Sequence, residues 1–254
     1  MKIVFCGKGG VGKSTVSKIY AEKLSKIKKI LLISIDQDHS LSLIFNKNIG
    51  NSITEIKENL YTIEVDAKSI SKNYINDIKE NISEFLSKRA FEEFEKYSKF
   101  ILDSSIAVNT AIIYGIYKIP KNFEVFIIDT PPSYQFISFL KTLFNLRKNL
   151  EIILKIYENW KNISENWASR KLKSYEKLKE KEIIALEVEE FFRSANYYIV
   201  INPNKLIIDL SLNLKSFLES LNLNFSGFIL NKYNNQDINL EKVVDKIEIL
   251  EKFF

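Results

Sequence analysis

The sequence is poor in residues that cross-link a chain or break its regular structure. Its 254 residues include seven glycines, four prolines and one cysteine. A single cysteine excludes an internal disulfide and any zinc site built from several thiolates of one chain. No apolar run reaches the ~20 residues of a membrane-spanning helix. The first strand-like run begins at residue 2, so we also expect no signal peptide.

Charge of one sign is also not concentrated anywhere. The chain has 37 Lys and Arg residues against 32 Asp and Glu, a net charge of +5, and its basic residues are scattered. We therefore expect no nucleic-acid partner. The length allows one large domain with a sizeable core. We predict a single domain over residues 1–254 in the cytoplasm, where mild positive charge would permit a peripheral position at a membrane.

Glycine, although rare, is clustered at one place. Residues 7–15 read GKGGVGKST, which matches the phosphate-binding pattern G-x-x-x-x-G-K-[ST]. The match follows an apolar run at 3–6 and precedes a helical pattern, as this motif requires. Its backbone N–H groups and the helix N-terminus would form an anion site, whereas the alternative is a plain tight turn. The predicted nucleotide-binding residues are Gly9, Gly10, Val11, Gly12, Lys13, Ser14 and Thr15.

Strand-like and helical segments alternate along the chain. Two of the strand-like segments contain continuous apolar runs (30–33 and 125–128), which are typical of parallel strands covered on both faces. The pattern predicts an α/β fold, a doubly wound, mostly parallel sheet with a P-loop and with its ligand at the carboxyl ends of the strands. The expected strands are 2–6, 30–35, 60–65, 123–128, 197–202 and 225–230, and the expected helices lie within 14–27, 67–119, 134–195, 205–221 and 239–253.

Two helical stretches, at about 67–119 and 136–195, are longer than a crossover between strands needs. Apolar residues recur in both at helical spacing, and in the second stretch Lys and Glu occupy the other faces, which indicates amphipathic helices. We expect them to form a helical subdomain inserted into the single domain. The clearest apolar stripe either forms the subdomain's own core or binds an apolar helix of a partner. That stripe comprises Ile152, Ile156, Trp160, Ile163 and Trp167.

Three charged residues complete the chemistry expected of the loop. Lys13 would reach the β- and γ-phosphates, and the Ser14 hydroxyl is the expected Mg²⁺ ligand. Asp129 ends a buried strand before a double proline, as a Walker B carboxylate does, although an Asp there can also merely cap a turn. Lys8 is a second lysine that such loops do not require. It is either a solvated surface lysine or a charge that reaches phosphates across a dimer interface.

The loop at 7–15 resembles the deviant Walker A motif of the dimerising ATPases that include MinD, ParA, nitrogenase iron protein and ArsA. Within this class, residues 31–42 (LLISIDQDHSLS) look like the switch I signature of the ArsA branch. That branch holds the arsenite-pump ATPase and the tail-anchored-protein targeting ATPase. Further similar segments complete the order along nearly the whole chain. They are residues 59–66, 126–133, 201–203 and 228–232.

This resemblance implies a homodimer that binds ATP and ADP with Mg²⁺ and hydrolyses ATP. It implies that Lys8 reaches the partner subunit's nucleotide and that Asp36 orients the attacking water. Ser14 would bind Mg²⁺, Asp129 would hold the metal or its waters, and Asn231 would read the adenine. The catalytic residues expected on this basis are Asp36, Lys8 and Lys13, and a switch role is expected of His39.

The chain departs from the family pattern in its switch segments. Gln37-Asp38 stands where Pro-Ala is usual, Leu43 replaces an Asp, and Ser133-Tyr134-Gln135 replaces Thr-Gly-His. These changes leave the phosphate-binding residues intact but alter the segments that time hydrolysis. The CxxC zinc motif of the eukaryotic targeting factor is absent from the sequence, so we expect no structural zinc.

The leading functional hypothesis is a nucleotide-switched factor that carries tail-anchored membrane proteins, with a hydrophobic client helix as its partner. One alternative is a pump-type ATPase that energises or regulates a membrane protein. Another is a MinD- or ParA-like partitioning ATPase with a terminal amphipathic helix. Residues 239–254 carry four acidic residues against three lysines, which matches anionic lipid poorly, so we expect them to pack on the sheet.

Overall fold

The computed structural model describes residues 1–38, 40–73, 92, 96, 104–161, 168–232 and 249–252, with side chains omitted at 157–161, 168–174 and 249–252. His39 and the side chains of Trp160, Ile163 and Trp167 lie outside this description. The chain divides into two compact units. The sheet unit comprises Met1–Asp66, Pro120–Ile137 and Phe191–Phe254, and the helical unit comprises Ala67–Ile119 and Ser138–Glu190.

The sheet unit is built on an eight-stranded sheet, in the order β3-β4-β2-β5-β1-β6-β7-β8. All neighbouring strands are parallel except β3 and β4, which pair antiparallel. The predicted α/β fold with a mostly parallel sheet is therefore confirmed. The strands are β1 (Lys2–Cys6), β2 (Ile30–Ser34), β3 (Thr54–Lys57), β4 (Leu60–Glu64), β5 (Val125–Asp129), β6 (Asn196–Ile201), β7 (Asn224–Leu230) and β8 (Ile249–Lys252).

The central strands are buried on both faces, as their unbroken apolar sequences predict. Every residue of β2 and β5 is buried, and so is every residue of β1 after Lys2. Asp129 at the end of β5 pairs in register with Phe5 of β1 and with Ser34 of β2. The carboxyl ends of these three strands therefore reach one edge of the sheet, which is where ligands bind in such folds.

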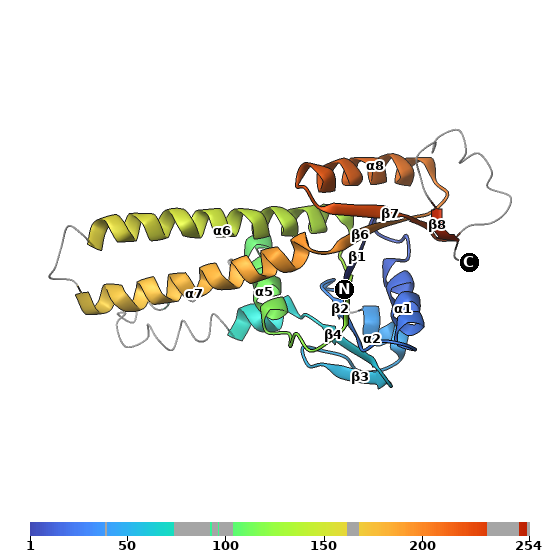
Figure 1. Cartoon of the computed structure of the whole chain (residues 1–254), viewed down its shortest axis with the longest axis horizontal. Helices are drawn as coiled ribbons and strands as arrows, with labels where there is room; N and C mark the ends of the chain where they lie inside the picture. The colour runs from blue at the N-terminus through green and yellow to red at the C-terminus, as the bar shows by residue number, and fades with distance from the viewer. Residues whose placement is uncertain are drawn as a thin grey trace. The chain divides into compact units, whose positions relative to one another are not determined.

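Within the described residues, three helices lie wholly in the sheet unit: α1 (Lys13–Leu24), α2 (Ser40–Phe45) and α8 (Lys205–Ser220). Helix α1 packs against β1, β2 and β5, and α8 packs against β6 and β7 (Figure 1). Asn204 caps α8, because its side-chain oxygen accepts a hydrogen bond from the Ile207 N–H at 3.3 Å. These helices cover the apolar strands and leave the carboxyl edge to loops.

The helical unit contains α5 (Ser105–Tyr117) and most of α6 (Ser133–Lys161) and α7 (Ala168–Arg193). Figure 1 shows α6 and α7 as a long pair, and Arg147 of α6 lies 3.9 Å from Glu189 of α7. Asn109 of α5 donates hydrogen bonds to Ser138 and Thr142 of α6, at 3.3 and 2.9 Å. The predicted helical insertion is confirmed as part of the fold. Its organisation as one domain with the sheet stays a prediction.

Helix α6 carries exposed isoleucines within the helical unit. The exposed fractions of Ile152 and Ile156, one turn apart, are 57% and 47%. Ile153 beside them is also exposed. Among the described residues, however, no helix is both long enough and apolar enough to cross a membrane.

The helix predicted at 239–253 is wrong at 249–252, while its residues 239–248 lie outside the described part of the chain. Two short elements have no counterpart among the predicted ones. The helical pattern at 239–253 ends in a strand: residues 249–252 form β8, which pairs in parallel with β7. Apolar residues at 247, 250 and 254 fit a helix, but pairing with the exposed edge of β7 competes with that local preference. Strand β3 and helix α2 are only four and six residues long, too short for a periodic signal.

Candidate nucleotide site

The phosphate loop (residues 7–15) connects β1 to α1, as the motif requires. Gly12 precedes α1 in the left-handed region, with φ of 90°. Lys13, the first residue of the helix, is buried, and its Nζ donates to the Lys8 carbonyl oxygen at 3.4 Å. Burial lowers the pKa of Lys13, while the nearby carboxylates of Asp129 and Asp36 act to raise it. The loop therefore holds a buried amine beside two acidic groups.

Asp129 is the most deeply buried acidic group of the site. The Ser17 hydroxyl donates to its Oδ1 at 3.5 Å, whereas Oδ2 has no hydrogen-bond partner among the described residues. Burial raises the pKa of Asp129 to about 7, although a hydrogen bond from Ser14 and the charge of Lys13 oppose the shift. An unpartnered carboxylate oxygen beside the loop hydroxyl fits Mg²⁺, which needs few protein ligands and keeps several waters.

Ser14 connects this carboxylate to a second segment. The Ser40 hydroxyl, at the start of α2, donates to the Ser14 hydroxyl at 2.9 Å. Ser14 also lies beside Asp129 and lowers the pKa of its carboxyl. The side chain predicted as the metal ligand therefore touches α2 as well as β5.

Asp36 follows β2 at the same edge of the sheet. The N–H of Asp38 donates to Asp36 Oδ1 at 3.4 Å. Burial raises the pKa of Asp36, and the hydrogen bond from Asp38 acts in the opposite direction. Lys13 and Asp129 each act electrostatically with Asp36, so the structure gathers these three predicted residues.

Among the switch residues that depart from the family pattern, one anchors a segment and others are exposed at the surface. The side-chain amide of Gln37 donates to the Val65 carbonyl oxygen at 3.1 Å, which attaches the segment after β2 to the end of β4. Leu43 and Tyr134 are mostly exposed, at 82% and 84%. The altered switch residues therefore change the surface near the site and the attachment of one segment, and leave Lys13 and Asp129 in place.

Asn231 lies one residue beyond β7, and its side chain is buried against the loop. Its Nδ2 donates to the Val11 carbonyl oxygen at 2.8 Å. The next residue, Lys232, donates from Nζ to the Gly10 carbonyl oxygen at 3.1 Å. The Asn231 amide nitrogen carries two hydrogens, and the contact with Val11 uses one of them. The adenine contact predicted for Asn231 therefore stays a prediction.

Three residues contact the site in the structure although the sequence analysis does not predict them as site residues. Ser17 had a usable signal, because it lies three residues after Ser14 and so shares its helix face. Ser40 had none beyond its nearness to Asp36. Lys232 follows Asn231, yet nothing in one sequence shows that its side chain turns back to the loop.

The raised pKa of Asp129 predicts a pH-dependent stability in the protein without metal or nucleotide. The folded pKa of about 7 exceeds the ordinary value of 3.8, so the folded state holds this proton more tightly than the unfolded state. Stability from this group is therefore complete below the unfolded pKa and is lost as pH rises to the folded pKa. Between about pH 5.5 and about pH 8, wild type should lose about 2 kcal/mol of unfolding free energy that Asp129→Asn retains.

Urea unfolding in a chelating buffer at the two pH values measures this difference. Asp209→Asn, which alters an exposed aspartate of α8, is the control and should follow wild type. Parallel pH profiles for wild type and Asp129→Asn would show that the Asp129 carboxyl is not protonated in the folded protein near neutrality.

Comparison with known proteins supports the family resemblance seen in the sequence, and the match extends over nearly the whole chain. The family model of the anion-transporting ATPases matches residues 1–253. A putative arsenical pump-driving ATPase 2 of Aquifex aeolicus is 29% identical over 98% of this chain and 85% of its own length. An ATPase ASNA1 homolog of Plasmodium falciparum is 27% identical over 92% of this chain, which spans only 64% of that relative.

One relative has a higher sequence identity over a shorter segment. A putative arsenical pump-driving ATPase of Chlorobaculum tepidum is 50% identical over 64 residues, which are 25% of this chain and 16% of the relative. The family model and these relatives are all named as ATPases, so the predicted enzyme class is confirmed. Together with the loop, Asp129 and the parallel sheet, the match over residues 1–253 places this chain in the anion-transporting, ArsA-type ATPase family.

Proposed function

We propose that the chain is a Mg²⁺-dependent nucleotide switch that hydrolyses ATP as a homodimer. The observation that carries this proposal is the fully buried carboxylate of Asp129, which has an open oxygen beside Ser14 and Lys13 of the phosphate loop. Ionisation of Asp129 destabilises the folded protein when no cation is bound, because burial raises the pKa of this carboxyl to about 7. A bound cation would relieve that cost.

Each residue has a role that its position supports. Lys13 and the loop N–H groups bind the phosphates, and Ser14 with Asp129 would hold Mg²⁺, which neutralises charge on the phosphate oxygens when bound. Asp36 orients the water that attacks the terminal phosphate. Asn231 contacts the adenine with the N–H that does not serve Val11. These assignments make ATP the substrate, and ADP and phosphate the products.

The homodimer is proposed from Lys8. Its carbonyl oxygen accepts from Lys13, but its own Nζ has no hydrogen bond or ion pair within the described part of the chain. A free amine on a phosphate loop is suited to a phosphate of a second subunit, as an arginine finger is in other nucleotide hydrolases. Hydrolysis would then require two subunits.

Two contacts support a switch. The Ser40 hydroxyl donates to Ser14, and the Ser133 N–H donates to the Gly7 carbonyl oxygen at 3.1 Å. The first joins the loop to the segment after Asp36, and the second joins it to the segment after Asp129. A change in the loop on nucleotide binding would therefore be felt by both segments.

The proposed client is an apolar membrane-protein helix bound by the helical unit. Ile152 and Ile156 expose apolar surface on one face of α6, and an apolar face with i, i+4 spacing suits a helical partner. These isoleucines form a small apolar patch on one helix, and a partner helix that covers it would remove this surface from water.

Replacing both isoleucines by serine should abolish client capture and leave folding intact. The test is co-expression with a single-span tail-anchored protein, followed by sizing of the purified complex with and without ATP. Wild type should bring the client into the complex, while Ile152→Ser/Ile156→Ser should bring less than about a tenth as much. Ile27→Ser, which removes a 76% exposed isoleucine of the sheet unit, is the matched control.

Equal capture by the double variant would remove α6 from the client-binding surface. If wild type itself captures no client in either condition, the pump-type alternative replaces this proposal. Relatives named as arsenical pump-driving ATPases favour that alternative. In such a role this chain would regulate a membrane partner without binding a metalloid, because Cys6 is fully buried and its pKa is raised to about 12 by burial.

A partitioning ATPase is less well supported. Its support is the amphipathic pattern at 239–253, and residues 249–252, the part of that segment that the structure describes, form strand β8.

A further inference from the structure

The phosphate loop is held from outside by two consecutive side chains at the end of β7. Asn231 Nδ2 donates to the Val11 carbonyl oxygen at 2.8 Å, and Lys232 Nζ donates to the Gly10 carbonyl oxygen at 3.1 Å. Their sequence distance from the loop is more than two hundred residues. Two adjacent peptide groups of the loop are thus fixed by one distant segment.

Peptide geometry gives these contacts a consequence for the ligand. The described residues contain no cis peptide bond, and in a planar trans peptide the N–H points opposite to the C=O. A donor on the Gly10 carbonyl therefore directs the Val11 N–H away from Lys232. In the same way, Asn231 directs the Gly12 N–H. Loop N–H groups of this kind bind phosphate oxygens only when they converge on one point.

The loop and the end of β7 also fit each other sterically. A Cβ placed on Gly12 would collide with Nδ2 of Asn231, so the glycine leaves the space that this amide fills. The backbone at Asn231 is anchored in turn, because its N–H donates to the Ile201 carbonyl oxygen at 2.8 Å. Lys232 has a φ of 58°, an unfavourable value for a residue with a Cβ, which other contacts must maintain.

We propose that Asn231 and Lys232 are positioning residues that hold the N–H groups of Gly12 and Val11 toward the phosphates of the ligand. This role rests on the proposed nucleotide site and adds to it a determinant of phosphate affinity outside the loop. It is separate from adenine recognition, because it serves any ligand with a polyphosphate chain.

The test compares a ligand that has a base with one that has none. Binding of Mg·ATP and of inorganic triphosphate with Mg²⁺ is measured by titration calorimetry for wild type, Lys232→Met and Asn231→Ala. Methionine keeps the length of the lysine stem and removes its donor. Lys232 is exposed, so this variant remains folded even if removal of the buried Asn231 amide destabilises the protein.

Loss of one hydrogen bond that orients the loop should lower the affinity for inorganic triphosphate about fivefold in Lys232→Met and about tenfold in Asn231→Ala. The affinity for Mg·ATP should fall by at least the same factors. Unchanged triphosphate affinity in both variants would overturn the proposal. A loss confined to Mg·ATP in Asn231→Ala would assign Asn231 to the base alone, which also overturns it.

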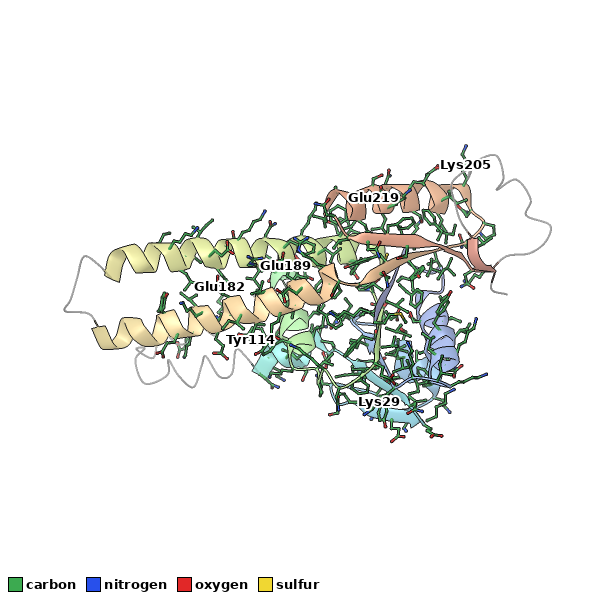
Figure 2. The ribbon with its side chains drawn as sticks, in the orientation of Figure 1. Lys29, Tyr114, Glu182, Glu189, Lys205 and Glu219 are labelled. Carbon is green, nitrogen blue, oxygen red and sulfur yellow. The ribbon has the colours of Figure 1, made fainter. Side chains whose placement is uncertain are left out.

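A matched lysine separates orientation from general charge. Lys205, at the start of α8, projects away from its helix in Figure 2 and is exposed. Lys205→Met removes the same charge from the sheet unit without touching the loop, so triphosphate affinity should stay within about twofold of wild type. An equal loss in Lys205→Met and Lys232→Met would reduce the effect of Lys232 to long-range attraction and overturn its positioning role.

Failure of this inference is distinguishable from failure of the proposed function. If wild type binds neither Mg·ATP nor inorganic triphosphate, the nucleotide site itself is wrong. If wild type binds both ligands and the two variants bind them equally well, only the positioning role is wrong.

Discussion

Replacement of Lys8 by alanine is expected to lower the rate of ATP hydrolysis about a thousandfold while Mg·ATP still binds, because a cation that completes a phosphoryl-transfer site is worth at least that factor. The phosphates of the same subunit retain Lys13, which is buried beside Asp129. Steady-state phosphate release measures the rate, and calorimetry measures the affinity. Turnover equal to wild type would exclude the shared site.

A mixing experiment shows which subunit supplies Lys8. Lys8→Ala and Asp36→Asn are each expected to be inactive alone. In a mixed dimer, the Asp36→Asn subunit would lend its Lys8 to the site of the Lys8→Ala subunit, which retains Asp36. Random pairing in equal amounts should then restore about a quarter of the wild-type rate. No restoration, despite exchange of subunits, would place Lys8 in its own subunit's site.

Substitution of Gly12 by alanine should destabilise the protein strongly through both its backbone conformation and its packing. Gly12 has a φ of 90°, and an added Cβ would collide with Asn231 Nδ2. The left-handed backbone costs about 1–2 kcal/mol for an L-residue, and overpacking adds a similar amount, so we expect a loss of about 3 kcal/mol. Urea unfolding without ligand measures it.

Gly10 provides the matched control. Its φ of 81° is similar, but a Cβ there meets nothing within 4 Å. Gly10→Ala should therefore cost only the backbone term, about 1–2 kcal/mol. Adding Asn231→Ala to Gly12→Ala should recover part of the loss, because it removes the obstacle. If the two glycine variants are equally destabilised, the collision with Asn231 is relieved at no cost.

The sheet could be predicted from the sequence because its central strands are apolar throughout. The run at 125–128 became β5 and the run at 30–33 lies in β2, each with every residue buried. β3 could not be predicted in this way, since a four-residue edge strand with alternate residues exposed carries little signal. The helical pattern at 239–253 does not reveal β8, because pairing with β7 is a tertiary effect.

The candidate site was predictable where a residue's chemistry and its place after a strand coincide. Lys13, Asp36 and Asp129 each follow or end a strand of the sheet, and the structure brings them together. Lys232 and Ser40 act through the direction of a side chain across a tertiary contact. One sequence carries no record of such a direction, so these contacts required the structure.

Burial of the lone thiol makes the native protein self-reporting. Cys6 lies in β1 at the centre of the sheet with no exposed surface, and its pKa is raised to about 12 by burial. Alkylating reagents attack the thiolate, so this sulfur reacts only in molecules whose central strand has opened. The labelling rate of one natural atom therefore measures how often the core of the ATPase opens, without an introduced probe.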